Sequence, residues 1–281
     1  MTNFRKINPK GLINLQKYSL FDTAARAELV ASARKSMATE GSAILPEFVL
    51  PGGIDLMRDE ALRLQPVSHR RERMLGAYAR LTQDTGDETH PVRRKSPYRM
   101  WVTATDQMDP EGATLRIYEW PPLVQLVADI LDRESLYTVA DPMMRCNYTF
   151  LGDGDEHGWH FDGNDFVVSL MIQSPEEGGA FEFAPNIRDE ENPNYTGVRD
   201  VMDEMPGTAK VIRARPGTLA LFRGRRSLHR VTRVSGERKR IIALLSYHEQ
   251  PGLMNGPEAQ IRVFGRSTHS DSASVNLSPA D

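Results

Sequence analysis

The stretch His157-Gly158-Trp159-His160-Phe161-Asp162 is the part of the chain on which the prediction of its fold depends. It ends in a His-x-Asp pair, His160 and Asp162. Because alternate side chains of an extended strand point to the same face, an imidazole nitrogen and a carboxylate oxygen converge there on one point. Two ligands hold a metal ion poorly, and His229 downstream can supply a third. The sequence therefore predicts a metal site formed by His160, Asp162 and His229.

The kind of metal follows from these donors. Two imidazoles and one carboxylate on one face of an ion leave the opposite face open, as in the facial triad of non-haem Fe(II) sites. The alternative is an ordinary hydrogen-bonded pair of His160 and Asp162 in a loop, because a His-x-Asp sequence often arises by chance. A Gly-rich segment before the pair, Gly152-Asp153-Gly154, and the run Pro216-Gly217-Thr218 before His229 favour the metal site.

Composition places the chain among ordinary globular proteins. Of its 281 residues, 40% are hydrophobic and 26% are charged, which is enough for a substantial core. The net charge of −3 lacks the basic excess of a nucleic-acid-binding protein. A single cysteine, Cys146, fits a reducing compartment, and neither a membrane span nor an apolar signal segment is evident. We therefore expect a cytoplasmic protein that binds neither nucleic acid nor membrane.

Helical patterns come first in the chain and strand patterns later, which is typical of the α+β class. Asp22 and Thr23 can cap a helix that ends at Gly41. Short apolar segments between Gly and Pro turns predict a sandwich or barrel in the second half. We expect one domain over residues 1–266, with a helical part at about 1–135 and a core at about 140–250, followed by a disordered tail at 267–281. The predicted helices are 24–39, 54–64, 121–131 and 195–205. The predicted strands are 144–150, 165–173, 180–183, 210–213, 218–222, 228–234 and 240–247.

Residues 66–112 carry two basic clusters and no clear periodicity. The clusters are His69-Arg70-Arg71-Glu72-Arg73 and Arg93-Arg94-Lys95. Charge runs of this kind are most often solvated surface. The alternative is that one or two of these arginines turn inward and bind an anionic group of a substrate.

Several segments together resemble a known family, the Fe(II)- and 2-oxoglutarate-dependent oxygenases. Within it, the chain is most similar to the branch that contains the free-amino-acid radical halogenases and their hydroxylase relatives. The resemblance covers roughly residues 115–250 and implies a double-stranded β-helix, or jelly-roll, core behind N-terminal helices. It is carried by Gly152-Asp153, the stretch 157–162, Gly178-Gly179-Ala180-Phe181-Glu182-Phe183, Pro216-Gly217-Thr218-Leu219, and Phe222-Arg223-Gly224 leading into His229-Arg230-Val231.

The resemblance implies Fe(II), 2-oxoglutarate and O2 as the co-reactants, and a cation for the far carboxylate of 2-oxoglutarate. A planar guanidinium suits that carboxylate. Arg238 and Arg240 share a face by strand period and Lys239 does not; we prefer Arg240, because it begins the predicted last strand. Asn147 and Tyr148 lie where relatives often hydrogen-bond 2-oxoglutarate, but either could equally be a buried residue of the sheet.

The carboxylate of Asp162 bears on the outcome of the reaction. Halogenases of this branch have a small residue there, and chloride takes the vacated position on iron. A carboxylate fills that position and repels a halide, so hydroxylation is expected, with desaturation or cyclisation left open. Two rival interpretations are weaker. A cupin-type dioxygenase would need a His-x-His pair, which the chain lacks. A non-catalytic jelly-roll metal-binding module would more often hold zinc with four ligands.

The resemblance also implies a small substrate, such as a free amino acid. His157 and Arg73 are candidates for binding its carboxylate, and Glu119 is a candidate for holding an amine of a basic substrate. For each of these residues a structural or surface role is the alternative. Trp159 could form a wall of the pocket, although a place in the core is the preferred interpretation. The sequence leaves a homodimer open.

Overall fold

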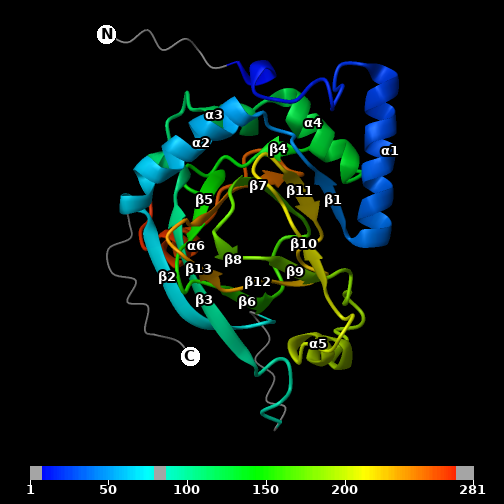
Figure 1. Ribbon diagram of the computed structural model, residues 1–281, viewed down its shortest axis with the longest axis vertical. Coiled ribbons are helices and arrows are strands. Elements are labelled where there is room, and N and C mark those ends of the chain that lie inside the picture. Colours follow the sequence, from blue (N-terminus) through cyan, green and yellow to red (C-terminus); the bar gives the residue numbers. More distant parts are fainter. Residues whose placement is uncertain (1–7, 79–86, 270–281) are drawn as a thin grey trace.

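The computed structural model describes residues 8–78 and 87–269, and most of the predicted tail at 267–281 lies outside them. Figure 1 shows a curled sheet with helices packed around it. The helices are α1 (Thr23–Glu40), α2 (Pro51–Leu64), α3 (Ala113–Tyr118), α4 (Pro121–Ile130), α5 (Tyr195–Met202) and α6 (Pro257–Phe264), with short 3-10 turns at Pro9–Gly11, Gln65–Val67 and Thr105–Gln107. No described helix is long and apolar enough to span a membrane.

The main sheet is antiparallel and has the order β1-β11-β7-β14-β5-β3-β6-β12-β9-β10, with β2 paired to β3. It curls into a jelly roll, as the sequence predicts. Its strands are β1 (Ser42–Leu45), β2 (His69–Gly76), β3 (Lys95–Thr103), β5 (Cys146–Leu151), β6 (His157–His160), β7 (Val167–Gln173), β9 (Phe181–Ala184), β10 (Lys210–Ile212), β11 (Leu219–Phe222), β12 (Leu228–Val231) and β14 (Arg240–Leu245). Two small ladders pair β4 (Tyr137–Thr138) with β15 (Tyr247–His248), and β8 (Glu177–Gly178) with β13 (Val234–Ser235).

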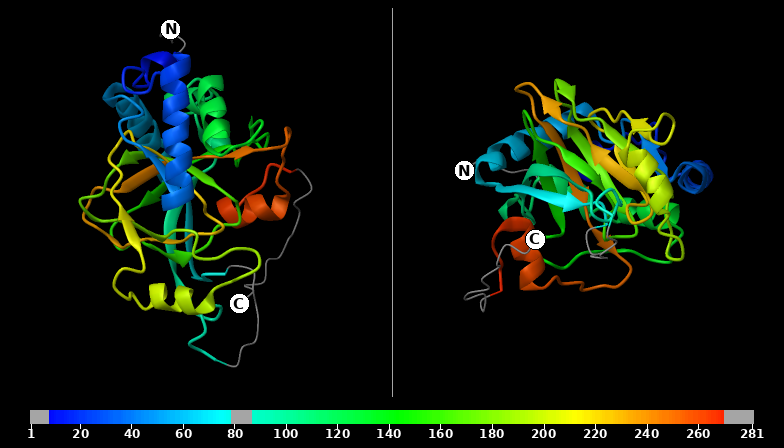
Figure 2. Two further views of the ribbon diagram at one scale, coloured as in Figure 1. Left: turned by 90° about the vertical axis from the view of Figure 1, so that its right-hand side faces the viewer. Right: turned by 90° about the horizontal axis from the view of Figure 1, so that it is seen from below.

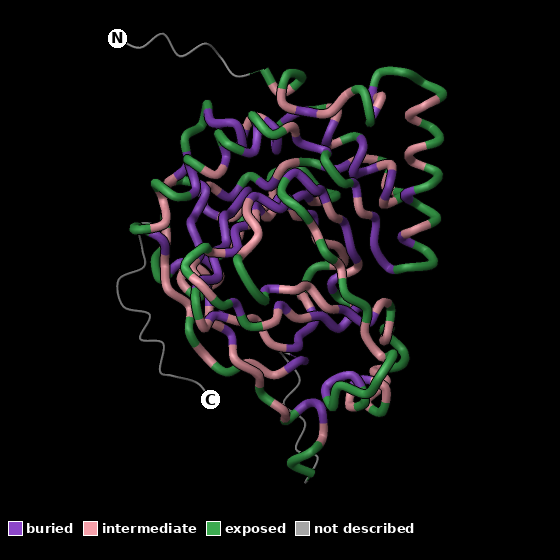
Figure 3. Tube along the Cα trace, viewed as in Figure 1, coloured by how far each residue is buried: buried purple, intermediate pink, exposed green. Residues whose placement is uncertain are grey.

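The predicted first helix is confirmed, together with both of its ends. The Asp22 side chain accepts a hydrogen bond from the backbone N–H of Ala25 at 2.8 Å and caps α1. Gly41 ends the helix in the left-handed region at φ 70°. Only one face of α1 is buried, through Ala33 and Met37, and Figure 3 shows its outer turns exposed.

Alternation along β5 and β14 separates the core from the interior of the barrel. Ile241, Ala243 and Leu245 of β14 lie in the large apolar cluster that also includes buried residues of α1 to α4. Arg240, Ile242 and Leu244 face the inside. Each fully buried aliphatic side chain contributes roughly 1.5–3 kcal/mol to folding. The helices, gathered mainly at one end of the barrel in Figure 2, therefore hold this sheet from outside and leave its inner face free for a site.

The β2–β3 hairpin is the main element that the sequence did not reveal. β2 pairs with β3 over its whole length, from His69 opposite Val102 to Gly76 opposite Lys95. The other edge of β3 pairs with β5 at Trp101–Thr103 and with β6 at Tyr98. The interpretation of the basic clusters as solvated surface is therefore wrong for Arg71 of the first cluster, which lines the interior, whereas Arg93 and Lys95 of the second cluster are exposed. Arginines interrupt the apolar alternation of β2, which hides its strand pattern.

Candidate functional site

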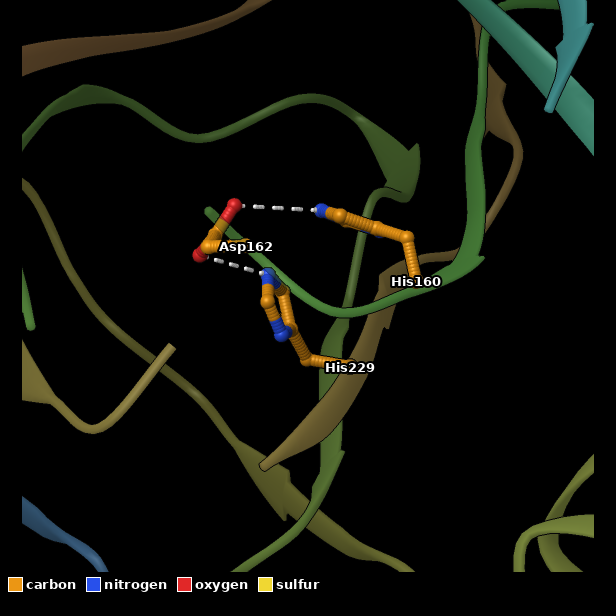
Figure 4. A group of neighbouring side chains, drawn as sticks. All are labelled: His160, Asp162 and His229. Atoms are coloured by element: carbon orange, nitrogen blue, oxygen red, sulfur yellow. Dashed lines mark ion pairs between the residues drawn. The ribbon is translucent and has the colours of Figure 1, made fainter. Parts of the chain in front are cut away.

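Three side chains converge inside the barrel (Figure 4). His160 ends β6 and lies directly opposite His229 of β12, and Asp162 follows two residues after β6 ends. The Nε2 atom of His229 lies 3.2 Å from Oδ2 of Asp162, and Nε2 of His160 lies 3.7 Å from Oδ1. One ligand atom from each residue lies within 4.8 Å of the other two. The predicted grouping of these three residues is what the structure contains.

Both imidazole rings are oriented by the backbone. Nδ1 of His160 lies 2.8 Å from the carbonyl oxygen of Gly158, and Nδ1 of His229 lies 2.9 Å from that of Ser227. A carbonyl oxygen can only accept, so each Nδ1 donates a hydrogen bond to the backbone, and Nε2 is left as the atom that can bind a metal ion. Such outer contacts fix the ring orientation of histidines that bind metals.

The charge states suit a cation. Burial and the neighbouring His229 lower the pKa of His160 to about 3, so its ring is neutral near pH 7. Burial acts to raise the pKa of Asp162, but the charge of His229 and its hydrogen bond outweigh that effect and lower the pKa. The site thus offers two imidazole rings, of which that of His160 is neutral, and an ionised carboxylate, which is the donor set of the non-haem iron facial triad.

A glycine makes room for the carboxylate. A Cβ at Gly224 would lie 2.3 Å from Oδ2 of Asp162 and 2.9 Å from its Cβ. The backbone N–H of Asp162 donates to the carbonyl oxygen of Gly224 at 3.1 Å. Any side chain at position 224 would therefore push the carboxylate away. The sequence analysis noted Gly224 within a matching segment but assigned it no function.

A bulge in β6 turns a further histidine toward the triad. His160 is opposite His229, yet His157 is opposite Val231, so three steps along β6 match two steps along β12. His157 consequently stacks on His160, with ring centroids 3.6 Å apart and planes at 14°. The ring of Tyr98 meets His157 edge-on at 4.3 Å. Nε2 of His157 is buried and has no hydrogen-bond partner among the described residues.

A cavity of about 840 Å³ opens beside the triad, and Arg240 lies in its wall. Arg240 is only 5% exposed, and its Nε donates to the carbonyl oxygen of Gly179 at 3.1 Å. Burial lowers its pKa to about 10, so it remains charged at neutral pH. No carboxylate among the described residues pairs with it. A buried charge without a partner is costly, which points to an anionic ligand.

Asn147 and Tyr148, the two residues of β5 that were also predicted to contact 2-oxoglutarate, lie on opposite faces of that strand. Asn147 lines the cavity, and its amide donates to carbonyl oxygens of Thr103 and Met143 at 3.2 and 2.8 Å. Tyr148 points to the opposite face, where its hydroxyl donates to Glu60 at 2.6 Å. The structure does not bring Tyr148 to the cavity, because consecutive residues of a strand face opposite sides.

Arg238 is likewise not brought to the cavity. It is exposed, and its guanidinium donates to the carbonyl oxygens of Ser174 and Pro175 at 3.0 and 3.2 Å. Of the two arginines that the sequence left as alternatives, only Arg240 faces the interior.

The basic cluster on β2 supplies a second arginine to the cavity, but not the predicted one. Arg71 lines the wall, with its guanidinium hydrogen-bonded to the Tyr98 hydroxyl and lying over that ring, 4.5 Å from its centroid. No carboxylate among the described residues pairs with Arg71. Arg73 lies over the same ring at 5.3 Å but does not line the cavity. Arg71 and Arg73 are two residues apart, so they lie on the same face of β2. This relation was missed because the sequence did not reveal β2 as a strand.

Glu119 and Trp159 lie elsewhere. Glu119 is exposed at the end of α3 and forms an ion pair with Arg145, outside the cavity. It is therefore not placed to hold an amine of a bound substrate. Trp159 is buried in an apolar cluster with Phe161 and Val198 on the other side of β6, which agrees with the preferred prediction of a core position.

Comparisons with known proteins agree on the fold. A family model described as Halogenase D matches residues 25–257. Among solved structures, the epimerase SnoN, described as non-haem and α-ketoglutarate-dependent, is 16% identical, with 80% of this chain and 81% of that chain covered and a TM-score of 0.53. AviO1 from Streptomyces viridochromogenes Tue57 is also 16% identical, with 81% of this chain and 97% of that chain covered and a TM-score of 0.53. A second SnoN structure contains Fe3+, α-ketoglutarate and nogalamycin RO. Comparison with curated proteins gave no match.

Proposed function

The chain belongs to the halogenase D family, and from this premise we propose that it is an Fe(II)- and 2-oxoglutarate-dependent dioxygenase. In this proposal it hydroxylates an unactivated C–H bond of a small carboxylate-bearing substrate, such as a free amino acid. One observation carries the proposal. His160, Asp162 and His229 converge on the wall of a cavity that also contains Arg240, a buried cation without a carboxylate partner.

The donor set fits Fe(II). His160 and His229 would bind through Nε2 and Asp162 through one carboxylate oxygen, with the opposite side of the ion open to the cavity. When bound, Fe(II) with 2-oxoglutarate and O2 supplies the oxidant, so that one oxygen atom enters the substrate C–H bond and the other enters succinate as CO2 is released. The two Nδ1–carbonyl hydrogen bonds keep the rings aimed at the ion.

Arg240 would bind the far carboxylate of 2-oxoglutarate. Its Nε is occupied by the Gly179 carbonyl, and its terminal amino groups are left for a carboxylate. The buried amide of Asn147 is already bonded to the carbonyl oxygens of Thr103 and Met143 and contributes to the shape of the cavity wall.

The carboxylate of the substrate would be bound by Arg71 and His157, which also line the cavity. Arg71 is held over Tyr98, and Nε2 of His157 lacks a protein partner. Burial, with His160 nearby, holds the pKa of His157 well below its usual value, so its ring is neutral and Arg71 supplies the charge. The stacked pair His157 and His160 then places this end of the substrate beside the triad.

Asp162 supports the proposal of hydroxylation, although the family is named after a halogenase. Its carboxylate lies between the two imidazoles at 3.2 and 3.7 Å and would occupy the position that a halide needs. The negative charge would repel the halide as well. Gly224 leaves space for this carboxylate, because a Cβ at that position would lie 2.3 Å from Oδ2 of Asp162.

The test is spectroscopic and then chemical. Anaerobic protein with Fe(II) and 2-oxoglutarate should give a visible charge-transfer band, which His160→Ala and His229→Ala should each abolish. A band that survives in both variants would refute the ligand assignment. With O2 and substrate, the product should be one oxygen atom heavier, and added chloride should give no chlorinated product.

We also propose that residues 1–266 form one oxygenase domain. The support is the single apolar cluster that joins α1, α2, α3 and α4 to the outer face of the sheet. Denaturant unfolding followed by two probes, one for helix and one for tryptophan, should then give coincident transitions.

A further inference from the structure

The surface next to Arg71 is set by the register of the β2–β3 hairpin. Arg71 of β2 is paired with Met100 of β3, so these two side chains lie side by side on the inner face of the hairpin. Tyr98, two residues away on the same face of β3, contacts Arg71 and is paired with His157 of β6. Met100 therefore lies next to Arg71 and is separated from His157 by the Tyr98 ring.

An apolar patch extends from Met100 along the wall of the cavity. It is formed by lining residues that belong to, or pack against, one apolar cluster, and it includes Met100, Val102, Met144, Leu151 and Val263. Thr149 of β5, which is opposite Val102, is a polar residue at its edge. A group attached to a carboxylate at Arg71 would meet Met100 and then the rest of this patch.

The helix α6 lies against the same hairpin. It contacts both β2 and β3, and Figure 1 shows it beside them. A Cβ at Gly265, directly after the helix, would lie 2.5 Å from the ring of His69, which is two residues before Arg71 on the same face of β2. Val263, in the last turn of α6, lines the cavity. The C-terminal helix thus contributes a side chain to the wall that begins at Arg71.

One buried carboxylate holds α6 in this place. Asp141 is fully buried and accepts hydrogen bonds from the side-chain amide of Gln260 in α6 at 3.1 and 3.0 Å. The same carboxylate accepts the backbone N–H groups of Met144 and Asn255, both at 3.0 Å, and these two residues also line the cavity. The position of α6 is therefore coupled to the cavity wall through Asp141.

Building on the proposed function, we infer that α6 is part of the substrate site, and that Val263 together with Met100 limits the size of the group that the substrate carries beside its carboxylate. Gln260 is a positioning residue in this arrangement, because it acts on the substrate only through Asp141 and the placement of α6. A larger side chain at position 263 would shorten the space that begins at Arg71, and a smaller one would lengthen it.

The experiment measures binding of amino acids that grow by one methylene at a time, namely alanine, 2-aminobutyrate, norvaline and norleucine. Anaerobic calorimetry on protein loaded with Fe(II) and 2-oxoglutarate gives each Kd. Val263→Phe should weaken norleucine relative to alanine by about tenfold or more, and Val263→Ala should shift the preference toward norleucine, because a single methylene in an apolar pocket changes discrimination by about that factor. Product formation with O2 should follow the same order in kcat/KM.

Ile261→Phe is the matched control, since it adds a ring to the same helix at a residue that does not line the cavity. It should leave the order of the four affinities unchanged. An order that stays the same in both Val263 variants, an equal change in Ile261→Phe, or failure of all four amino acids to bind the wild type would overturn the inference.

Gln260→Met tests the positioning residue, because it keeps the volume and removes the hydrogen bonds to Asp141. Norleucine should bind about tenfold more weakly and alanine should be little affected, since only the longer side chain reaches α6. A loss of stability with all four affinities unchanged would show that Gln260 has a structural role alone.

The charge-transfer band with Fe(II) and 2-oxoglutarate separates failure of this inference from failure of the proposed function. A band that is present in every variant while the Val263 substitutions leave the affinities unchanged would remove only the role of α6. Absence of the band in the wild type would remove the function itself. If one Val263 variant does not fold, as judged by its band, the other variant against Ile261→Phe decides.

Discussion

Two walls of the same cavity are built in different ways. On β6 and β12, each histidine of the triad is fixed by a hydrogen bond to a backbone carbonyl two residues before it. On the β2–β3 hairpin, Arg71 is held by one side chain, through the hydroxyl and the ring of Tyr98. The first wall is fixed by local backbone and the second by contacts between side chains from two strands. The first should therefore tolerate little change, and the second should tune affinity.

The largest expected effect is at Asp162. Replacing it with Gly removes one of three ligands, and a metal ion contributes several kcal/mol to stabilising the transition state. We expect hydroxylated product to fall by about three orders of magnitude. The measurement is product formation at saturating Fe(II) and 2-oxoglutarate. Undiminished hydroxylation would mean that the carboxylate is not a required ligand.

The second-largest effect is expected at Gly224, which lies against the carboxylate of Asp162. A Cβ at Gly224 would lie within 2.3 Å of Asp162, so Gly224→Ala should displace the carboxylate and weaken Fe(II) binding about 10–100-fold. Titration of the charge-transfer band with Fe(II) measures this. Gly52→Ala, where a Cβ meets nothing within 4 Å, is the matched control and should bind Fe(II) normally. Equal affinities in both variants would show that the close approach is not required.

The second wall should respond differently. Arg71→Leu removes a charged hydrogen bond to the substrate, worth about 1.5–3 kcal/mol, so KM should rise about 10–100-fold. The charge-transfer band should stay unchanged, because the triad does not contact Arg71. Arg73→Leu, which alters the neighbouring arginine over the same ring but outside the cavity, should change KM by less than about threefold. A larger effect at Arg73 than at Arg71 would exchange their proposed functions.

The contrast between the walls also explains how far the sequence could be interpreted. His160 and Asp162 are two residues apart in one segment, so the alternation of an extended chain was enough to predict that they converge, although β6 itself ends at His160. The downstream His229 completed the set. Arg71 depends on the pairing of β2 with β3, which arginines in β2 concealed. The bulge that brings His157 beside His160 has no signature in the strand period. Sequence therefore indicated the triad, Arg240 and His157 as candidates, and it missed Arg71, whose position depends on the unrecognised pairing of β2 with β3.

The smallest effect is expected on the outer face of β5, where Tyr148 lies on the side of the strand opposite Asn147. Its hydroxyl bonds to Glu60 at 2.6 Å and contacts the Thr114 hydroxyl. Tyr148→Phe leaves these buried partners unsatisfied and should cost about 1–3 kcal/mol of unfolding free energy, measured by denaturant titration. Binding of 2-oxoglutarate should not change, since the tyrosine faces the helices and not the cavity. Loss of 2-oxoglutarate affinity without loss of stability would instead return Tyr148 to the co-substrate site that its position in the sequence suggested.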